Sequence, residues 1–148
     1  MNLAKALKTK SRLVQKITQL QNDIQRHNSI PEDQERKIDV TSLMAELDAA
    51  IESLVQLKIT IFVASTPVRE TILRLAELKS RVSFLRGMDV YEGKGKDSDS
   101  YRFSDQDVVF SVEYDVIWQR DEIAKCEAMI DAMQDQLDAF NHKTEIEV

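Results

Sequence analysis

Glycine and proline are scarce in this chain, which has only three Gly and two Pro among 148 residues. Because these residue types form tight turns and end helices, their scarcity favours a few long elements over many short strands. Hydrophobic residues make up 43% and charged residues 31% of the sequence, as is typical of folded globular or coiled-coil proteins. The length suits a single core, so we expect residues 1–148 to form one domain.

Cysteine and histidine, which often bind metals or take part in catalysis, are scarce as well. The chain has one cysteine, Cys126, so no intrachain disulfide can form, and a reducing compartment is expected. Cys126 falls among apolar residues with helical spacing, where we expect a buried packing thiol. His27 and His142 lie far apart and belong to no H-x-x-x-H or E-x-x-H pair, and no catalytic or phosphate-loop motif occurs. We therefore expect no metal, no cofactor and no enzymatic activity.

Acidic residues outnumber basic ones, and the formal net charge is -6. This balance argues against general nucleic-acid binding, which needs an excess of Lys and Arg to displace counterions. No run of apolar residues approaches the ~20 that span a bilayer, so we expect no transmembrane segment. These features predict a cytoplasmic protein, located in the host cytoplasm if the chain is encoded by a phage.

The charges are distributed unevenly along the chain. Five basic residues precede the first acidic residue, Asp23, whereas the last third is rich in Asp and Glu. The five are Lys5, Lys8, Lys10, Arg12 and Lys16. Two interpretations stay open: each charged run is a solvated helix face, or the basic first helix lies beside the acidic last helix, in the same subunit or in a neighbour.

Apolar residues recur with spacings of three, four and seven in four segments, which predicts four amphipathic helices. The first segment, residues 2–28, contains Leu3, Leu7, Leu13, Val14, Ile17, Leu20 and Ile24. The second begins near Asp39 or Thr41 and contains Leu43, Leu47, Ala50, Leu54, Leu57 and Ile61. The third, from Pro67 to about Arg86, contains Ile72, Leu75, Leu78, Val82 and Leu85. The last contains Ile123, Cys126, Ile130, Met133, Leu137 and Phe140. We expect an all-α antiparallel bundle of about four long helices with coiled-coil seams.

Polar or glycine-containing segments separate the predicted helices. At "ASTPVRET", Thr66 is a good N-cap and Pro67 suits the first helical position. Gly87 is placed to end the third helix as a C-cap. The insert that follows, residues 87–110, holds all three glycines and leads into "DVVFSVEYDV", whose alternating apolar residues predict a short strand or an extended lead-in. A lone strand needs a partner, which another subunit could supply.

The turn and the insert also hold the residues best suited to bind a ligand. Arginine presents a flat fork of donors to a carboxylate or phosphate, and tyrosine offers a ring for stacking. The first turn of the third helix adds free N–H groups and the positive end of the helix dipole. The predicted site comprises Thr66, Arg69, Arg74, Arg81, Tyr91, Tyr101 and Arg102. The alternative is that the arginines pair with Glu70, Glu77 and the acidic last helix, while the aromatic residues pack the insert onto the bundle.

Several segments resemble one known group of proteins. They are "MNLAKAL…LVQKITQLQNDIQRH", "SLMAELDAAIESLVQLKITI", "RVSFLRGM", "YRFSDQDVVFSVEYDV" and the ending "FNHKTEIEV". Together they are similar to the small septicolysin-like family of bacterial and phage proteins. The resemblance implies an all-helical bundle, and the family's name implies a pore-forming lysin. The junction "ASTPVRET" is shorter than the Asn- and Thr-rich turn expected in that family.

Three functions are compatible with these features. The first is a non-catalytic oligomeric bundle that binds a small anionic or nucleotide-like ligand; in a phage it would act as a sponge for a host signalling nucleotide. The second is a structural or protein-interaction module that uses exposed helical seams. The third is a membrane-active, lysin-like protein. Apolar residues outside the main stripes favour a homo-oligomer: Met44, Val55, Phe62, Leu73 and Phe84.

Overall fold

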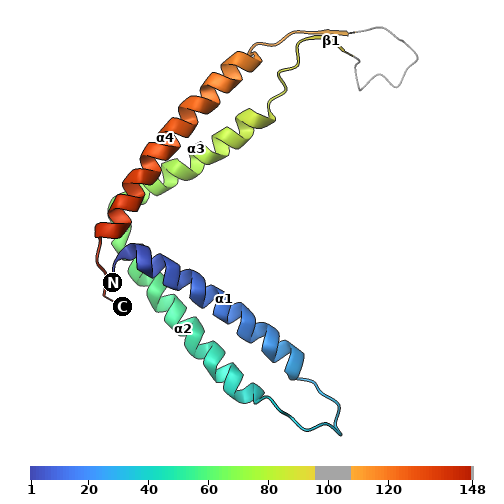
Figure 1. The fold of residues 1–148 in the computed structure, drawn as a ribbon, viewed down its shortest axis with the longest axis vertical. Helices are drawn as coiled ribbons and strands as arrows, with labels where there is room; N and C mark the ends of the chain where they lie inside the picture. Colours follow the sequence, from blue (N-terminus) through green and yellow to red (C-terminus); the bar gives the residue numbers. More distant parts are fainter. Residues whose placement is uncertain (96–107, 148) are drawn as a thin grey trace, which may run out of the picture. The chain divides into compact units, whose positions relative to one another are not determined.

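The computed structural model describes residues 1–95 and 108–147, and these residues form an all-α protein with one small two-stranded sheet (Figure 1). The elements are α1 (Leu3–His27), α2 (Val40–Ala64), the short 3-10 helix η1 (Thr66–Val68), α3 (Arg69–Gly87), β1 (Gly93–Gly95), β2 (Val108–Phe110) and α4 (Val116–Lys143). The predicted all-α class and the four predicted helices are therefore confirmed, and the arrangement of the four helices in one antiparallel bundle stays a prediction.

The chain divides into two compact units. The first, here called the terminal unit, comprises residues 1–69 and 137–148. The second, the central unit, comprises residues 70–136. The expectation of a single bundle domain stays a prediction.

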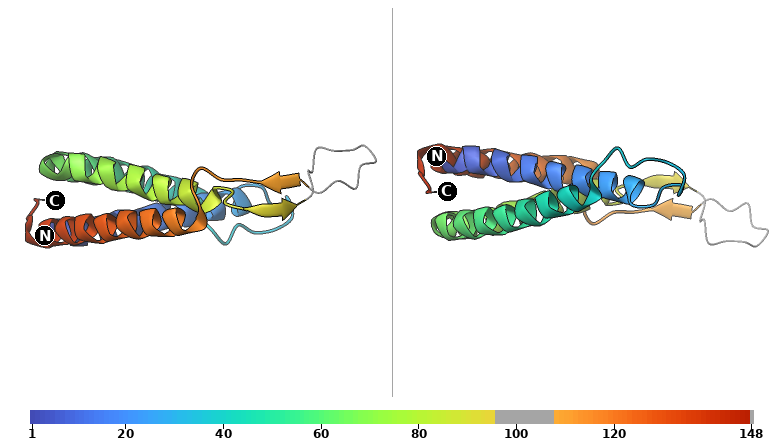
Figure 2. Two further views of the ribbon diagram at one scale, coloured as in Figure 1. Left: turned by 90° about the horizontal axis from the view of Figure 1, so that it is seen from above. Right: turned by 90° about the horizontal axis from the view of Figure 1, so that it is seen from below.

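In the terminal unit, α1 and α2 run side by side in opposite directions (Figures 1 and 2). Their predicted stripes meet in two apolar clusters. One contains Leu20, Ile24, Leu47 and Ala50, and the other contains Leu3, Ala6, Leu57 and Ile146. The α2 seam follows the predicted positions, because a four-three alternation keeps one side of a helix against its partner.

Both helices of the terminal unit begin at side-chain caps. The Asn2 Oδ1 atom accepts a hydrogen bond from the Lys5 amide at 2.9 Å. Asp39 accepts bonds from the Ser42 amide at 3.2 Å and the Ser42 hydroxyl at 2.7 Å. The bonds from Ser42 lower the pKa of Asp39, because they stabilise its charged form. The predicted start of the second helix near Asp39 is confirmed.

The two ends of the chain pair with each other. The Leu3 amide donates to the Thr144 carbonyl at 2.8 Å, and the Ile146 amide donates to the Met1 carbonyl at 2.8 Å. Asn2 and Glu145 lie opposite each other as an antiparallel bridge. Ile146 is 7% exposed and covers the cluster around Leu3. Residues 144–146 thus help to close the core of this unit.

In the central unit, α3 and α4 pack around Val82, Leu85 and Cys126. The Cys126 side chain is 3% exposed, so the predicted buried thiol is confirmed. The Asp115 Oδ1 atom accepts a bond from the Trp118 amide at 2.8 Å at the start of α4. Sequence reasoning missed this cap, although an Asp that precedes an apolar helix is a usual start signal.

Two residues expected on the apolar stripes are exposed. Val14 is 44% and Ile72 is 42% exposed. At about 100° per residue, Val14 lies roughly a quarter turn around the helix from the centre of the α1 stripe. Ile72 lies at a similar angle from the centre of the α3 stripe. A helix covered by one neighbour buries a narrower stripe than one inside a bundle, so these edge positions stay open to solvent.

The segment from the end of α3 to β2 corrects two further expectations. Gly87 is the last residue of α3, but its φ is not positive, so it does not form a left-handed C-cap. The glycine that needs its conformational freedom is Gly93, with a φ of 110°. β2 pairs antiparallel with β1, Val108 opposite Gly95, so the strand finds its partner within the same chain (Figure 2).

Candidate functional site

Two of the predicted site residues, Thr66 and Arg69, follow α2 as the first residues of η1 and α3, and both bind the Phe62 carbonyl. The Arg69 Nη2 atom donates to this oxygen at 2.8 Å, and the Thr66 hydroxyl donates at 3.5 Å. The Arg69 guanidinium also lies 3.8 Å from the centroid of the Phe62 ring. The last carbonyls of a helix have no partner within the helix, so these donors act as a C-terminal cap.

The predicted N-cap role of Thr66 is therefore wrong. Thr66 is the first residue of η1, and the residue before it, Ser65, makes no side-chain capping bond. The amides here are mostly engaged: Ser65 donates to Ile61, Val68 to Ser65 and Arg69 to Thr66. Pro67 has no amide hydrogen. The free N–H groups expected at this turn are consequently few.

The arginines of α3 form ion pairs within the central unit. Arg74 binds Glu70 at 2.8 Å, and Arg86 binds Glu127 on α4. The Arg81 Nη1 atom lies 3.0 Å from the Cys126 sulfur and 3.1 Å from the Glu122 carboxylate. The bond to Cys126 and then that to Glu122 raise the pKa of Arg81, so its charge is fixed at any ordinary pH. This is the pairing alternative drawn from the sequence, with Glu70 and the acidic last helix as partners.

Tyr91 lies in the hairpin, where its hydroxyl donates to the Lys94 carbonyl. Its ring meets the Phe110 ring edge-on, with centroids 5.8 Å apart. A Cβ atom on Gly95 would lie 3.1 Å from both rings, so a glycine there lets the rings close over the strand. Tyr101 and Arg102, the other predicted site residues of the insert, lie outside the described residues.

The described part of the predicted site is thus distributed over separate places, and each member has a local partner. Thr66 and Arg69 cap α2, Arg74 and Arg81 hold carboxylates, and Tyr91 packs in the hairpin. The structure does not bring these residues together around one cavity within either unit. The ligand hypothesis based on all seven residues stays a prediction.

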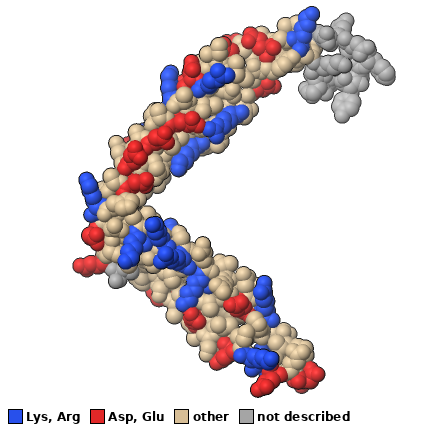
Figure 3. Space-filling view, viewed as in Figure 1, with Lys and Arg blue, Asp and Glu red and all other residues tan. Residues whose placement is uncertain are grey.

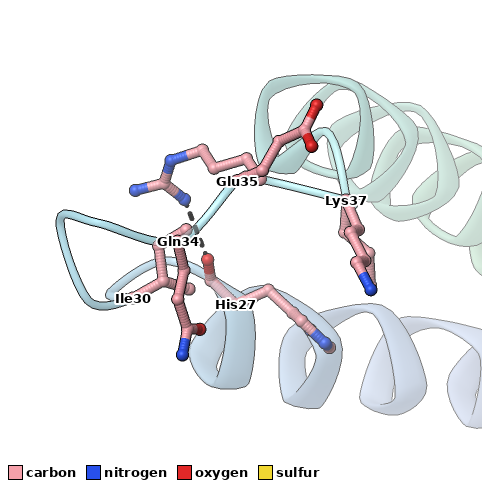
Figure 4. A pocket seen from close by; sticks show the side chains of 7 residues that line it. His27, Ile30, Gln34, Glu35 and Lys37 are labelled. Atoms are coloured by element: carbon pink, nitrogen blue, oxygen red, sulfur yellow. Dashed lines mark hydrogen bonds between the residues drawn. The ribbon is translucent and has the colours of Figure 1, made fainter.

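An open hollow of about 530 Å³ lies at the loop between α1 and α2 (Figure 4). It is lined by His27, Ile30, Gln34, Glu35, Arg36, Lys37 and Ile38. The Arg36 guanidinium caps α1 by donating to the carbonyls of His27 and Asn28, both at 2.9 Å. The His27 Nδ1 atom lies 2.8 Å from the Asp23 carbonyl, which leaves Nε2 available to a ligand. Nothing in the local pattern predicted this hollow, because residues 28–39 have no helical or strand spacing.

A row of exposed apolar side chains runs along α2. We call it the α2 apolar row, and it comprises Met44, Ile51, Val55, Ile59 and Phe62. Ile59 is 52% and Phe62 is 61% exposed. Sequence reasoning named Met44, Val55 and Phe62 but missed Ile51 and Ile59. Their spacing of four on either side of Val55 was the signal that could have identified them.

The described residues offer no metal site and no membrane span. In residues 1–95 and 108–147, no three His, Cys, Asp or Glu side chains are grouped to hold a metal ion. None of the helices in these ranges has the length and apolar character needed to cross a bilayer.

Comparisons with protein-family models, with curated proteins and with solved structures give no match. The resemblance to the septicolysin-like family, and the membrane-lytic function that its name implies, stay predictions.

Proposed function

We propose that this chain is a non-catalytic helical module that works by binding other helices, above all those of a second copy, through the α2 apolar row. The observation that carries the proposal is this row itself. Its five side chains share one side of a single helix, and each is at least 40% exposed. Contiguous exposed apolar surface of this kind usually marks an interaction site.

The row follows one side of α2 along most of the helix. From Met44 to Phe62 its members follow one another at intervals of seven, four, four and three. At 1.5 Å per residue the row is about 27 Å long. It lies roughly a third of a turn from the seam that contacts α1, so α2 can hold α1 and a second helix at once.

The chemistry of the described polar residues supports a binding role. The arginines best suited to hold a ligand instead cap a helix or pair with carboxylates inside one unit. Arg81 and Arg86 pair with carboxylates of α4. The side chains of the α2 apolar row, by contrast, remain at least 40% exposed. A helix of matching spacing is the partner that buries such a row most completely.

Sedimentation velocity of the wild-type chain over a wide concentration range tests this proposal. We expect a dimer or larger assembly, and we expect the double variant Ile51→Glu/Val55→Glu to be monomeric with an unchanged helical circular dichroism spectrum. The matched control is Ala49→Glu/Ser53→Glu, which adds the same charges to exposed positions on another side of α2. A wild-type chain that is monomeric at every concentration, or a row variant that assembles normally, contradicts the proposal.

The second candidate function is the binding of a small anionic or nucleotide-like ligand, as a sponge would do. The observation that favours it is the hollow at the α1–α2 loop, which offers the His27 ring and the Lys37 ammonium beside Arg36. A dianionic phosphate group suits such donors.

Calorimetric titration with pyrophosphate and with cyclic nucleotides tests this second candidate. We expect affinity that Lys37→Ala lowers and that Lys58→Ala, a matched change on the exposed side of α2, leaves unchanged. Loss of binding in Arg69→Ala or Arg102→Ala alone would instead support the site predicted from the sequence. Absence of heat with every ligand contradicts the candidate.

A further inference from the structure

Two rows of opposite charge run along two different helices. The α1 basic row comprises Lys5, Lys8, Arg12 and Lys16, and the α4 acidic row comprises Glu127, Asp131, Asp135 and Asp138. Intervals of three and four keep each row on one face of its helix. Figure 3 shows Lys and Arg side chains gathered along α1 and Asp and Glu side chains along α4. Each row extends over about 16 Å.

The middle of each row is exposed and lacks a countercharge. Lys16 at one end binds Glu46 at 2.7 Å, and Glu127 binds Arg86. Within residues 1–95 and 108–147, by contrast, Lys8, Arg12, Asp131 and Asp135 form no ion pair. Isolated surface charges are ordinary, but two rows of opposite sign and equal length on one chain are complementary.

The intervals of the two rows match when the helices run antiparallel. Along α1 the steps are three, four and four, and from Asp138 back to Glu127 they are also three, four and four. Lys5 then faces Asp138, Lys8 faces Asp135 and Arg12 faces Asp131. The fourth pair is Lys16 with Glu127. In a parallel arrangement that starts with Lys5 opposite Glu127, the second and third acidic residues lie one residue beyond their basic partners. One residue corresponds to a rotation of about 100° around the helix, so these side chains would not face each other.

We infer that α1 of one copy docks antiparallel along α4 of a second copy, basic row against acidic row. The inference rests on the proposed self-association and adds a contact that the α2 apolar row does not include. Because each chain carries both rows, each of two copies offers the other a basic and an acidic row, as an isologous contact requires. Ala128 and Ala132, both exposed beside the acidic row, leave room for a close approach of the second helix.

A charge-swap mixing experiment tests the inference. In Lys8→Glu/Arg12→Glu the middle positions of both rows are acidic, and in Asp131→Lys/Asp135→Lys the middle positions of both rows are basic. We expect each variant alone to self-associate at least about tenfold more weakly than the wild type, because attractions become repulsions in both contacts. An equimolar mixture restores association, since each acidic row then meets a basic one. The control Lys58→Glu/Lys79→Glu makes the same change in net charge at exposed positions outside the rows.

A zero-length carbodiimide cross-link between carboxylates and lysines provides the second readout on the wild-type chain. In a mixture of ¹⁴N- and ¹⁵N-labelled protein, we expect a Lys8–Asp135 link that joins light to heavy peptides. At about 1 M salt the Debye length falls to about 3 Å, and the yield of this link should fall with it.

The outcomes separate this inference from the proposed function. If the wild type assembles but the mixture of swapped variants does not recover association, or the link joins only peptides of one label, the row contact is wrong and the proposed function stands. If the wild type is monomeric and the mixture also fails, both are wrong. If the wild type and the mixture associate and Ile51→Glu/Val55→Glu also associates normally, the row contact is supported and the α2 apolar row is not.

Discussion

Replacement of Ile146 by alanine should destabilise the terminal unit, because this side chain covers the cluster formed by Leu3, Ala6 and Leu57. An isoleucine-to-alanine change in a core typically costs about 2–5 kcal/mol, which combines lost burial with the cavity left behind. Ile146 is 7% exposed and lies in a segment able to move into the gap, so we expect the lower part of that range, about 2–3 kcal/mol. The bonds between the backbones of Ile146 and Met1, at 2.8 and 3.0 Å, do not involve the side chain and remain.

The assay is urea denaturation followed by circular dichroism, with amide exchange at Leu3 as a local probe. The Leu3 amide donates to Thr144, so loosening of the chain end should speed its exchange. Glu145→Ala is the control: its side chain is 73% exposed, and we expect a loss below about 0.5 kcal/mol. An Ile146→Ala variant as stable as this control, with Leu3 exchange unchanged, would refute the account of how the chain ends pack.

Three further predictions concern the caps of α1 and α2 and the core of the central unit. Asn2→Ala should cost about 1 kcal/mol in urea denaturation by removing the cap of α1, while Asn2→Asp should keep the wild-type stability. Leu85→Ala should cost about 2–5 kcal/mol, since Leu85 is 1% exposed, and a loss under 1 kcal/mol contradicts the packing of α3 on α4. The lowered pKa of Asp39 means that its cap stabilises α2 above the unfolded value of 3.8 and is lost as pH falls below it. In an acid titration of helicity, Asp39→Asn should remove that part of the pH dependence, and an unchanged acid transition would speak against the cap.

Much of the fold follows from local patterns. Leu47, Ala50 and Leu57 are buried as their spacing predicts, because a seam of this kind can face only one side of a helix. Asp39 begins α2 because its carboxylate accepts the Ser42 amide, one of the free N–H groups of the first turn, which is also a local effect. The predicted burial of Val14 and Ile72 was wrong for the opposite reason. Tertiary packing decides how many helices cover a stripe, and no local pattern encodes that number.

The candidate site was less predictable, since its chemistry depends on which partner each side chain finds. Thr66 suits an N-cap in sequence, yet its hydroxyl binds the preceding helix because the chain continues almost without interruption from α2 into η1. Arg81 meets Glu122 and Cys126 from more than 40 positions away, a contact that periodicity cannot specify. The pairing of Met1 with Ile146 likewise joins opposite ends of the sequence.

The most direct test of the central claim, that exposed helical faces hold copies of this chain together, is sedimentation equilibrium of the wild-type protein. We predict an average mass that rises with concentration to at least twice that of one chain, and that Ile51→Glu/Val55→Glu returns it to the single-chain value. A wild-type mass equal to one chain across the whole concentration range would contradict the claim.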